Sequence, residues 1–137
     1  MVDKEVVYKR LNHLENKIKN LQEIEQFSKE EFSNNRDVYF RYERALHLAL
    51  EAVIDLGNHL IAEKNLRTPD SNRDVFKVLY ENNFINKKLC SKLEKLAGSG
   101  NILVYDYMTL DRELEFAIIR DNLDDFRKFM EIVVDNF

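Results

Sequence analysis

The sequence predicts an all-α protein, a single up-down bundle of about five helices. Three observations predict this class. Apolar residues recur at steps of three and four over long stretches, glycine and proline number only 3 and 1 in 137 residues, and hydrophobic residues make up 45% of the chain. A chain of this length is the size of one domain, so we expect residues 1–137 to form one helical domain.

The first half of the chain predicts two long helices. Residues 3–33 carry one narrow apolar stripe, whose alternating spacing suits a seam against an antiparallel neighbour: Val7, Leu11, Leu14, Ile18 and Leu21. Residues 35–62 carry a wider apolar face, which predicts the central helix: Phe40, Leu46, Ala49, Leu50, Val53, Ile54, Leu60 and Ile61. Pro69 then disfavours helix at Thr68 and predicts a loop.

Two further helices are predicted between Pro69 and the glycines. Ser71 or Asn72 can cap a short helix that stops near Asn82 and Asn83, because asparagine tolerates the left-handed conformation at a helix end. Its apolar residues are Val75, Phe76, Val78, Leu79 and Tyr80. Asn86 can cap the next helix, which carries Leu89, Leu93 and Leu96.

Gly98 and Gly100 stand before the last predicted helix. Two of the three glycines lie in this short run, so we expect the backbone either to bend here or to approach another surface closely. Thr109 or Asp111 is expected to start the final helix. Its predicted apolar stripe consists of Leu114, Ala117, Ile118, Leu123, Phe126, Met130 and Val133.

The charge balance argues against a general nucleic-acid binder. Lys and Arg number 21 against 25 Asp and Glu, a formal net charge of −4, so any RNA contact has to be local. The best candidates for phosphate contact are Lys92 and Lys95, on a helix face shared with Lys87 and Lys88, although such faces are usually solvated surface. The single cysteine, Cys90, is expected to be a buried thiol, and the N-terminus has no apolar run, so we expect a cytoplasmic protein without a membrane span.

The run from Lys95 to Tyr107 resembles the signature of the HepT-like toxins of the HEPN superfamily. In that signature an arginine precedes Asn-Ile-Leu-Val-His-x-Tyr, and here Gly98-Ser-Gly-Asn-Ile-Leu-Val-Tyr-Asp-Tyr107 occupies the same place. Other landmarks follow the family order over roughly residues 45–130: segment 57–63, Pro69, segment 74–76, Leu110-Asp111 and segment 123–126.

The resemblance implies an all-α HEPN fold that forms a homodimer and pairs with a nucleotidyltransferase antitoxin of the MNT type. Active members of the family cut RNA without a metal. An arginine holds the scissile phosphate, and a histidine moves protons to or from the attacking hydroxyl or the leaving oxygen. No metal or other cofactor is therefore expected.

Both catalytic side chains of the family are missing from this chain. Gly100 stands at the arginine position and Tyr105 at the histidine position. A phenol with an ordinary pKa of about 10 is a poor proton shuttle at neutral pH, and losing acid-base catalysis alone costs ~10²–10⁴-fold in rate. We therefore expect a catalytically degenerate subunit that acts by dimerisation and partner binding. The alternative is a ribonuclease with a substituted site that uses Tyr105 and cations such as Lys92, Lys95 or Arg112.

Tyr107 keeps the tyrosine of the motif, which in this family can receive AMP from the nucleotidyltransferase. We expect it to be the modified residue, against the alternative of an ordinary packed tyrosine. Asn101 and Asp106 complete the motif.

Three polar residues of the central helix form a second candidate group. Asp55, Asn58 and His59 lie at i, i+3 and i+4, so they share a face that could line a polar cleft near the motif. One histidine and one carboxylate lack the third ligand that zinc needs, so a structural polar network is preferred to a metal site.

Overall fold

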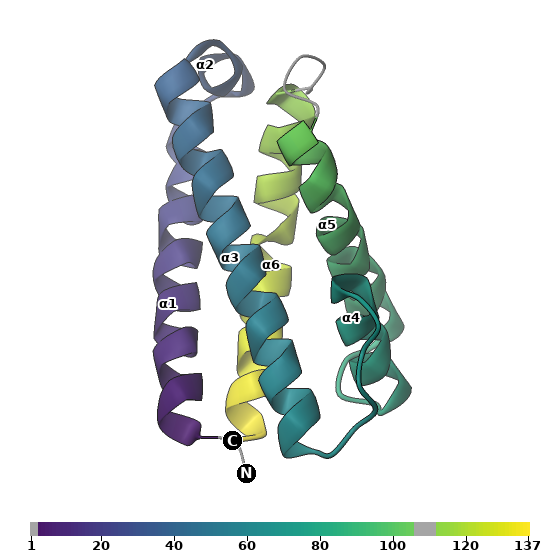
Figure 1. Cartoon of the computed structure of the whole chain (residues 1–137). Coiled ribbons are helices and arrows are strands. Elements are labelled where there is room, and N and C mark those ends of the chain that lie inside the picture. Colours follow the sequence, from purple (N-terminus) through teal and green to yellow (C-terminus); the bar gives the residue numbers. More distant parts are fainter. Residues whose placement is uncertain (1–2, 106–111) are drawn as a thin grey trace.

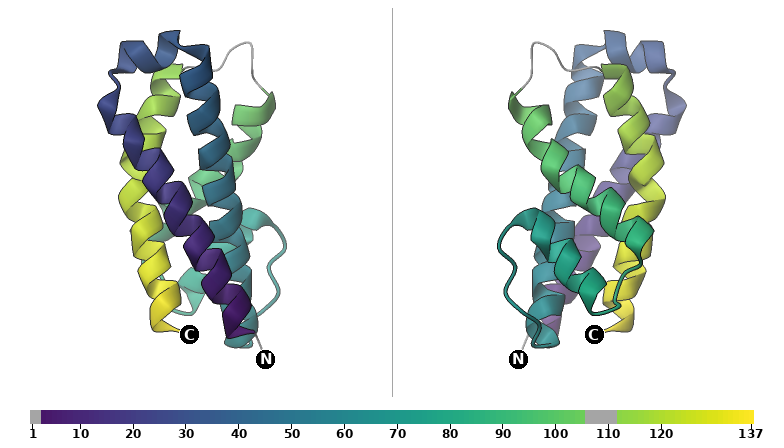
Figure 2. Two further views of the ribbon diagram at one scale, coloured as in Figure 1. Left: turned by 90° about the vertical axis from the view of Figure 1, so that its left-hand side faces the viewer. Right: turned by 90° about the vertical axis from the view of Figure 1, so that its right-hand side faces the viewer.

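A computed structural model of the chain describes residues 3–105 and 112–137, with side chains in 3–98 and 112–137. Four long helices lie side by side and run alternately up and down (Figures 1 and 2). The start of the first helix and the end of the last helix lie at the same end of the bundle. The elements are α1 (Lys4–Gln22), a 3₁₀ turn η1 (Glu23–Gln26), α2 (Lys29–Asn34), α3 (Arg36–Glu63), α4 (Asn72–Glu81), α5 (Lys87–Tyr105) and α6 (Arg112–Asp135). The predicted all-α, up-down class is confirmed.

The helix α3 forms the centre of the bundle and contacts each of the other five α-helices. The stripe of α1 faces it, as the sequence predicted, and all five of its apolar residues are buried: Val7, Leu11, Leu14, Ile18 and Leu21. Because α1 and α3 run in opposite directions, this seam joins antiparallel neighbours.

By length and composition alone α3 could also cross a membrane, since an 18-residue window has a mean hydropathy of 1.2. Within the bundle, 56% of that window is buried against other helices, as expected for the core helix of a folded domain.

The prediction of one helix over residues 3–33 is wrong. The chain leaves α1 at Gln22, passes through η1 and starts a new helix after Ser28. There the backbone N–H of Glu31 donates to Ser28 Oγ at 3.1 Å, and the N–H of Ser28 donates to Glu31 Oε1 at 3.1 Å. This reciprocal capping box fixes the start of α2, which turns the chain across the end of the bundle and buries Phe32.

The middle elements begin and end where the sequence predicted. Ser71 caps α4 through a 3.1 Å bond from the N–H of Asp74, and Asn83 takes a positive φ of 64° just after the helix. The N–H of Leu89 donates to Asn86 Oδ1 at 2.8 Å, which caps α5. Residues 66–69 form the predicted loop at Pro69.

The bend predicted at Gly98 and Gly100 is wrong, because α5 continues as helix through both positions to Tyr105. The other possibility, that a glycine lets the backbone approach a neighbouring element closely, holds for Gly98. A Cβ at Gly98 would lie 3.4 Å from Cδ of Arg73 on α4. The glycine that allows the tightest approach is Gly57 on α3, where a Cβ would lie only 2.6 Å from Cγ1 of Val75.

The stripe of α6 is shifted from its predicted register. Leu114 is 55% exposed, Ala117, Ile118 and Met130 are partly buried, and the buried apolar residues are Phe116, Ile119, Leu123, Phe126, Phe129 and Val133. Phe40 and Tyr80, predicted on apolar faces, are likewise exposed. The predicted starts of α6, Thr109 and Asp111, lie outside the described residues.

Candidate functional site

The motif falls at the end of α5. Gly100, Asn101 and Tyr105 belong to its last two turns, although their side chains lie outside the described residues. Asp106 and Tyr107 also lie outside them. The described surroundings of the motif are therefore the body of α5 and the start of α6, which begins seven residues after Tyr105.

At the start of α6, Arg112 is held in a buried cluster. Its Nη1 lies 2.9 Å from Glu115 Oε2 and 3.3 Å from Glu43 Oε2, and its Cζ lies 3.8 Å from the centroid of the Tyr39 ring. The Arg112 side chain is only 15% exposed. Two carboxylates and an aromatic face thus neutralise and cover this guanidinium, so it is poorly placed to hold a phosphate.

The same cluster perturbs the titration of Glu115. Burial, and then the charge of Glu43, raise the pKa of Glu115 to about 7, while its bond to Arg112 acts in the opposite direction. Glu115 is fully buried, and its Oε1 has no hydrogen-bond partner. One cation thus faces two buried carboxyls, which favours the protonated form of Glu115 near neutral pH.

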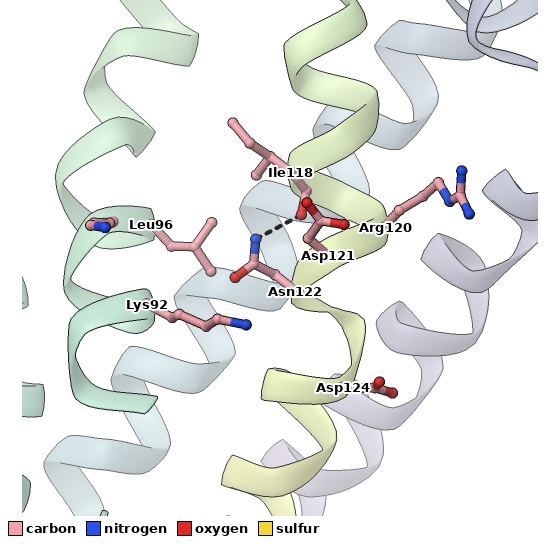
Figure 3. A pocket seen from close by; sticks show the side chains of 8 residues that line it. Lys92, Leu96, Ile118, Arg120, Asp121, Asn122 and Asp124 are labelled. Carbon is pink, nitrogen blue, oxygen red and sulfur yellow. Dashed lines mark hydrogen bonds between the residues drawn. The ribbon is translucent and has the colours of Figure 1, made fainter. Parts of the chain in front are cut away.

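A groove between α5 and α6 brings together the predicted phosphate contacts, Lys92 and Lys95 (Figure 3). Lys92 Nζ lies 3.3 Å from Oδ2 of Asp125, whose side chain is 5% exposed, so this lysine compensates a buried charge. Arg120 points away from α5. Of the two predicted contacts, Lys95 is the exposed one, and phosphate binding at either remains a prediction.

Of the predicted group Asp55, Asn58 and His59, the structure brings Asp55 and His59 together in a polar network, which is the interpretation preferred from the sequence. Asp55 Oδ2 lies 2.9 Å from Nε of Arg10 on α1 and 3.5 Å from Nε2 of His59, and Asn58 is exposed. Asp55 and His59 therefore serve the contact with α1, which lies on the side of α3 away from α5 (Figures 1 and 2).

Metal binding and thiol chemistry gain no support from the part of the chain that is described. Within it, no three His, Cys, Asp or Glu residues gather closely enough to hold a metal ion. Cys90 is buried, and its thiol donates to Glu94 Oε1 at 3.2 Å. The predicted burial of this thiol is confirmed, and burial, with the neighbouring Glu94, raises the pKa of Cys90 to about 12, which disfavours the reactive thiolate.

Sequence reasoning missed the buried carboxylates Glu43, Glu115 and Asp125. Charged residues are rarely buried unless paired, so none of the three was assigned to the core. One signal was available in the sequence: Arg112 and Glu115 are spaced i, i+3, so they can form an ion pair on one face of a helix.

Comparison with known proteins now places the chain. The family model described as ribonuclease HepT-like matches residues 14–133. The chain belongs to this family. It is 29% identical over 133 residues to the mRNA nuclease HepT of Shewanella oneidensis, covering 94% of this chain and 96% of that one. It is also 29% identical over 89 residues to the putative RNase YutE of Bacillus subtilis, covering 63% of this chain and 62% of that one.

Solved structures of HepT-like toxins match over nearly the whole chain. The tri-AMPylated HEPN toxin of Shewanella oneidensis in complex with MNT antitoxin superposes with a TM-score of 0.86 at 27% identity, covering 95% of this chain and 97% of that one. A toxin–antitoxin structure with AMP-PNP gives a TM-score of 0.87 at 26% identity, covering 96% and 98%. The relation to this chain therefore extends over the entire helical bundle.

Proposed function

We propose that this chain is the HepT-like subunit of a toxin–antitoxin pair, which forms a homodimer in the cytoplasm and binds an MNT-type nucleotidyltransferase. The observation that carries the proposal is the match, over 95% of the chain, to an AMPylated toxin bound to such an antitoxin. A bundle that keeps the fold over nearly its full length also keeps the scaffold on which a partner surface is built.

We further propose that the subunit has lost ribonuclease activity. Gly100 supplies no charge where the family has an arginine, and Tyr105 replaces the histidine. Of the three cations considered for a substituted site, Arg112 is bound by two carboxylates and Lys92 by one, and the exposed Lys95 supplies only a single charge. Without a phosphate clamp and a proton shuttle, the chain can bind RNA but lacks the groups that break it.

Tyr107 is the proposed acceptor of AMP. In this step the phenol oxygen attacks the α-phosphorus of ATP, an O–P bond forms, pyrophosphate leaves, and a base of the nucleotidyltransferase takes the phenol proton. The added phosphate introduces negative charge beside the motif, which would further disfavour RNA.

The test combines the purified chain with a nucleotidyltransferase of the MNT type and ATP. We expect a stable complex and a mass increase of one AMP group on the peptide that contains Tyr107. Tyr107→Phe should keep the complex and lose this modification, whereas Tyr105→Phe is the matched control and should keep both. A chain that neither binds the transferase nor gains mass would contradict the proposal.

A second candidate function is metal-independent cleavage of RNA by a substituted site, which the description of the Shewanella relative as an mRNA nuclease favours. Cleavage of mRNA or tRNA in EDTA, abolished by Tyr105→Phe, would support it. Cleavage unaffected by this change would point to contamination or to another site.

A further inference from the structure

A second groove lies on the opposite side of the bundle from α5, between α1 and α3. It has a volume of about 290 Å³. The last turns of α1 and η1 contribute Lys17, Asn20 and Glu23, and the first half of α3 contributes Arg41, Tyr42, Arg44, Ala45 and Leu48. These residues belong to the end of the bundle at which η1 and α2 connect α1 to α3 (Figures 1 and 2).

The residues that line this groove include three cations, Lys17, Arg41 and Arg44, and one carboxylate, Glu23. Lys17 is half-buried and Arg41 and Arg44 are exposed, and none of the three makes an ion pair within 4.0 Å among the described residues. In a protein with a net charge of −4, three unpaired cations around one hollow make a local positive site.

One residue that lines the groove, Tyr42, carries a polar group without a partner. Tyr42 is 1% exposed, and its hydroxyl oxygen is buried with no hydrogen bond in the described structure. A buried hydroxyl that makes no hydrogen bond destabilises the fold, and a bound acceptor would remove that cost. The centroid of the Tyr42 ring lies 5.9 Å from that of Phe27 and 5.2 Å from Cζ of Arg41.

We propose that this groove binds a phosphate group. The guanidinium groups of Arg41 and Arg44 and the ammonium group of Lys17 supply charge-assisted donors, and the Tyr42 hydroxyl and the Asn20 amide supply neutral ones. None of the residues that line the groove belongs to α5 or to the motif, so the site can fail or hold independently of the proposed function. The phosphate can come from a free nucleotide or from the backbone of RNA.

The test measures binding to the purified full chain by calorimetry in EDTA, with three probes: pyrophosphate, ATP and a short single-stranded RNA. The double variant Arg41→Gln, Arg44→Gln should weaken binding at least tenfold, because both residues are exposed and carry the proposed contacts. The double variant Lys4→Gln, Lys9→Gln removes the same charge from exposed positions of α1 and should bind as the wild type does.

Tyr42→Phe separates binding from folding. It removes a hydroxyl that has no partner in the unliganded chain, so stability should be kept or improved while affinity falls severalfold. Binding of pyrophosphate and ATP without RNA identifies a nucleotide site. Binding of RNA alone, with a salt dependence that decreases in the Arg41→Gln, Arg44→Gln variant, identifies a backbone site. No binding of any probe, or binding unchanged in the double variant, would overturn the proposal.

Discussion

Replacing Glu115 with glutamine should remove most of the pH dependence of stability between pH 5 and pH 8. The pKa of Glu115 is raised from an ordinary 4.5 to about 7 in the fold, chiefly by burial. A carboxyl whose pKa is raised on folding binds its proton more tightly when folded. Its contribution to stability is thus fully present below pH 4.5 and is lost as the pH rises through about 7.

The size of the effect follows from the two pKa values. The interval between 4.5 and about 7 corresponds to about 3 kcal/mol, at about 1.4 kcal/mol for each pKa unit. Glutamine keeps the shape of the side chain and an oxygen for Arg112 but cannot ionise. The variant should therefore be more stable than the wild type at pH 8, by up to about 3 kcal/mol, and similar to it at pH 5.

Urea denaturation followed by circular dichroism at a series of pH values measures this difference. Glu131→Gln is the matched control, since Glu131 is an exposed residue of the same helix. A Glu115→Gln variant whose stability changes with pH as steeply as that of the wild type would refute the reasoning.

Four further variants test the packing and ion pairs. Gly57→Ala should destabilise the fold by about 1–3 kcal/mol, because the added Cβ would meet the buried side chain of Val75. Gly98→Ala should be neutral or stabilising, because the added Cβ would meet only the flexible side chain of Arg73. Thermal melts compare the two variants. Arg67→Gln should move the pKa of Asp74 from about 2 toward 3.8, because Arg67 Nη1 and Nη2 bind that carboxylate at 2.8 and 2.9 Å; a carboxyl titration by NMR that stays near 2 would contradict this. Arg112→Met should cost about 3–5 kcal/mol in urea denaturation, since two buried glutamates lose their cation; an unchanged midpoint would show that the cluster is not needed.

The parts of the fold that sequence predicted well are those with a local cause. The stripe of α1, the caps Ser71 and Asn86 and the loop at Pro69 each depend on residues within a turn or two, and the structure has all of them. The break after Gln22 also has a local cause, the capping box of Ser28 and Glu31, but there the apolar periodicity dominated the interpretation.

The candidate site was less predictable because its contacts are not local. Nothing near Glu43 in the sequence indicates that Arg112, 69 positions away, will bind it. Asp55 and His59 were correctly placed on one face of α3, but which helix that face meets depends on the packing of the whole bundle. Local periodicity places residues on a face, and tertiary packing decides what the face contacts.

RNA cleavage by the purified chain in EDTA is the most direct test of the lost nuclease. The reference is the double variant Gly100→Arg, Tyr105→His, which restores both family side chains on the same bundle. We expect no cleavage by the wild type above a protein-free control, and cleavage by the double variant faster by at least ~10²-fold. Cleavage by the unmodified wild type at the rate of the double variant would contradict the account.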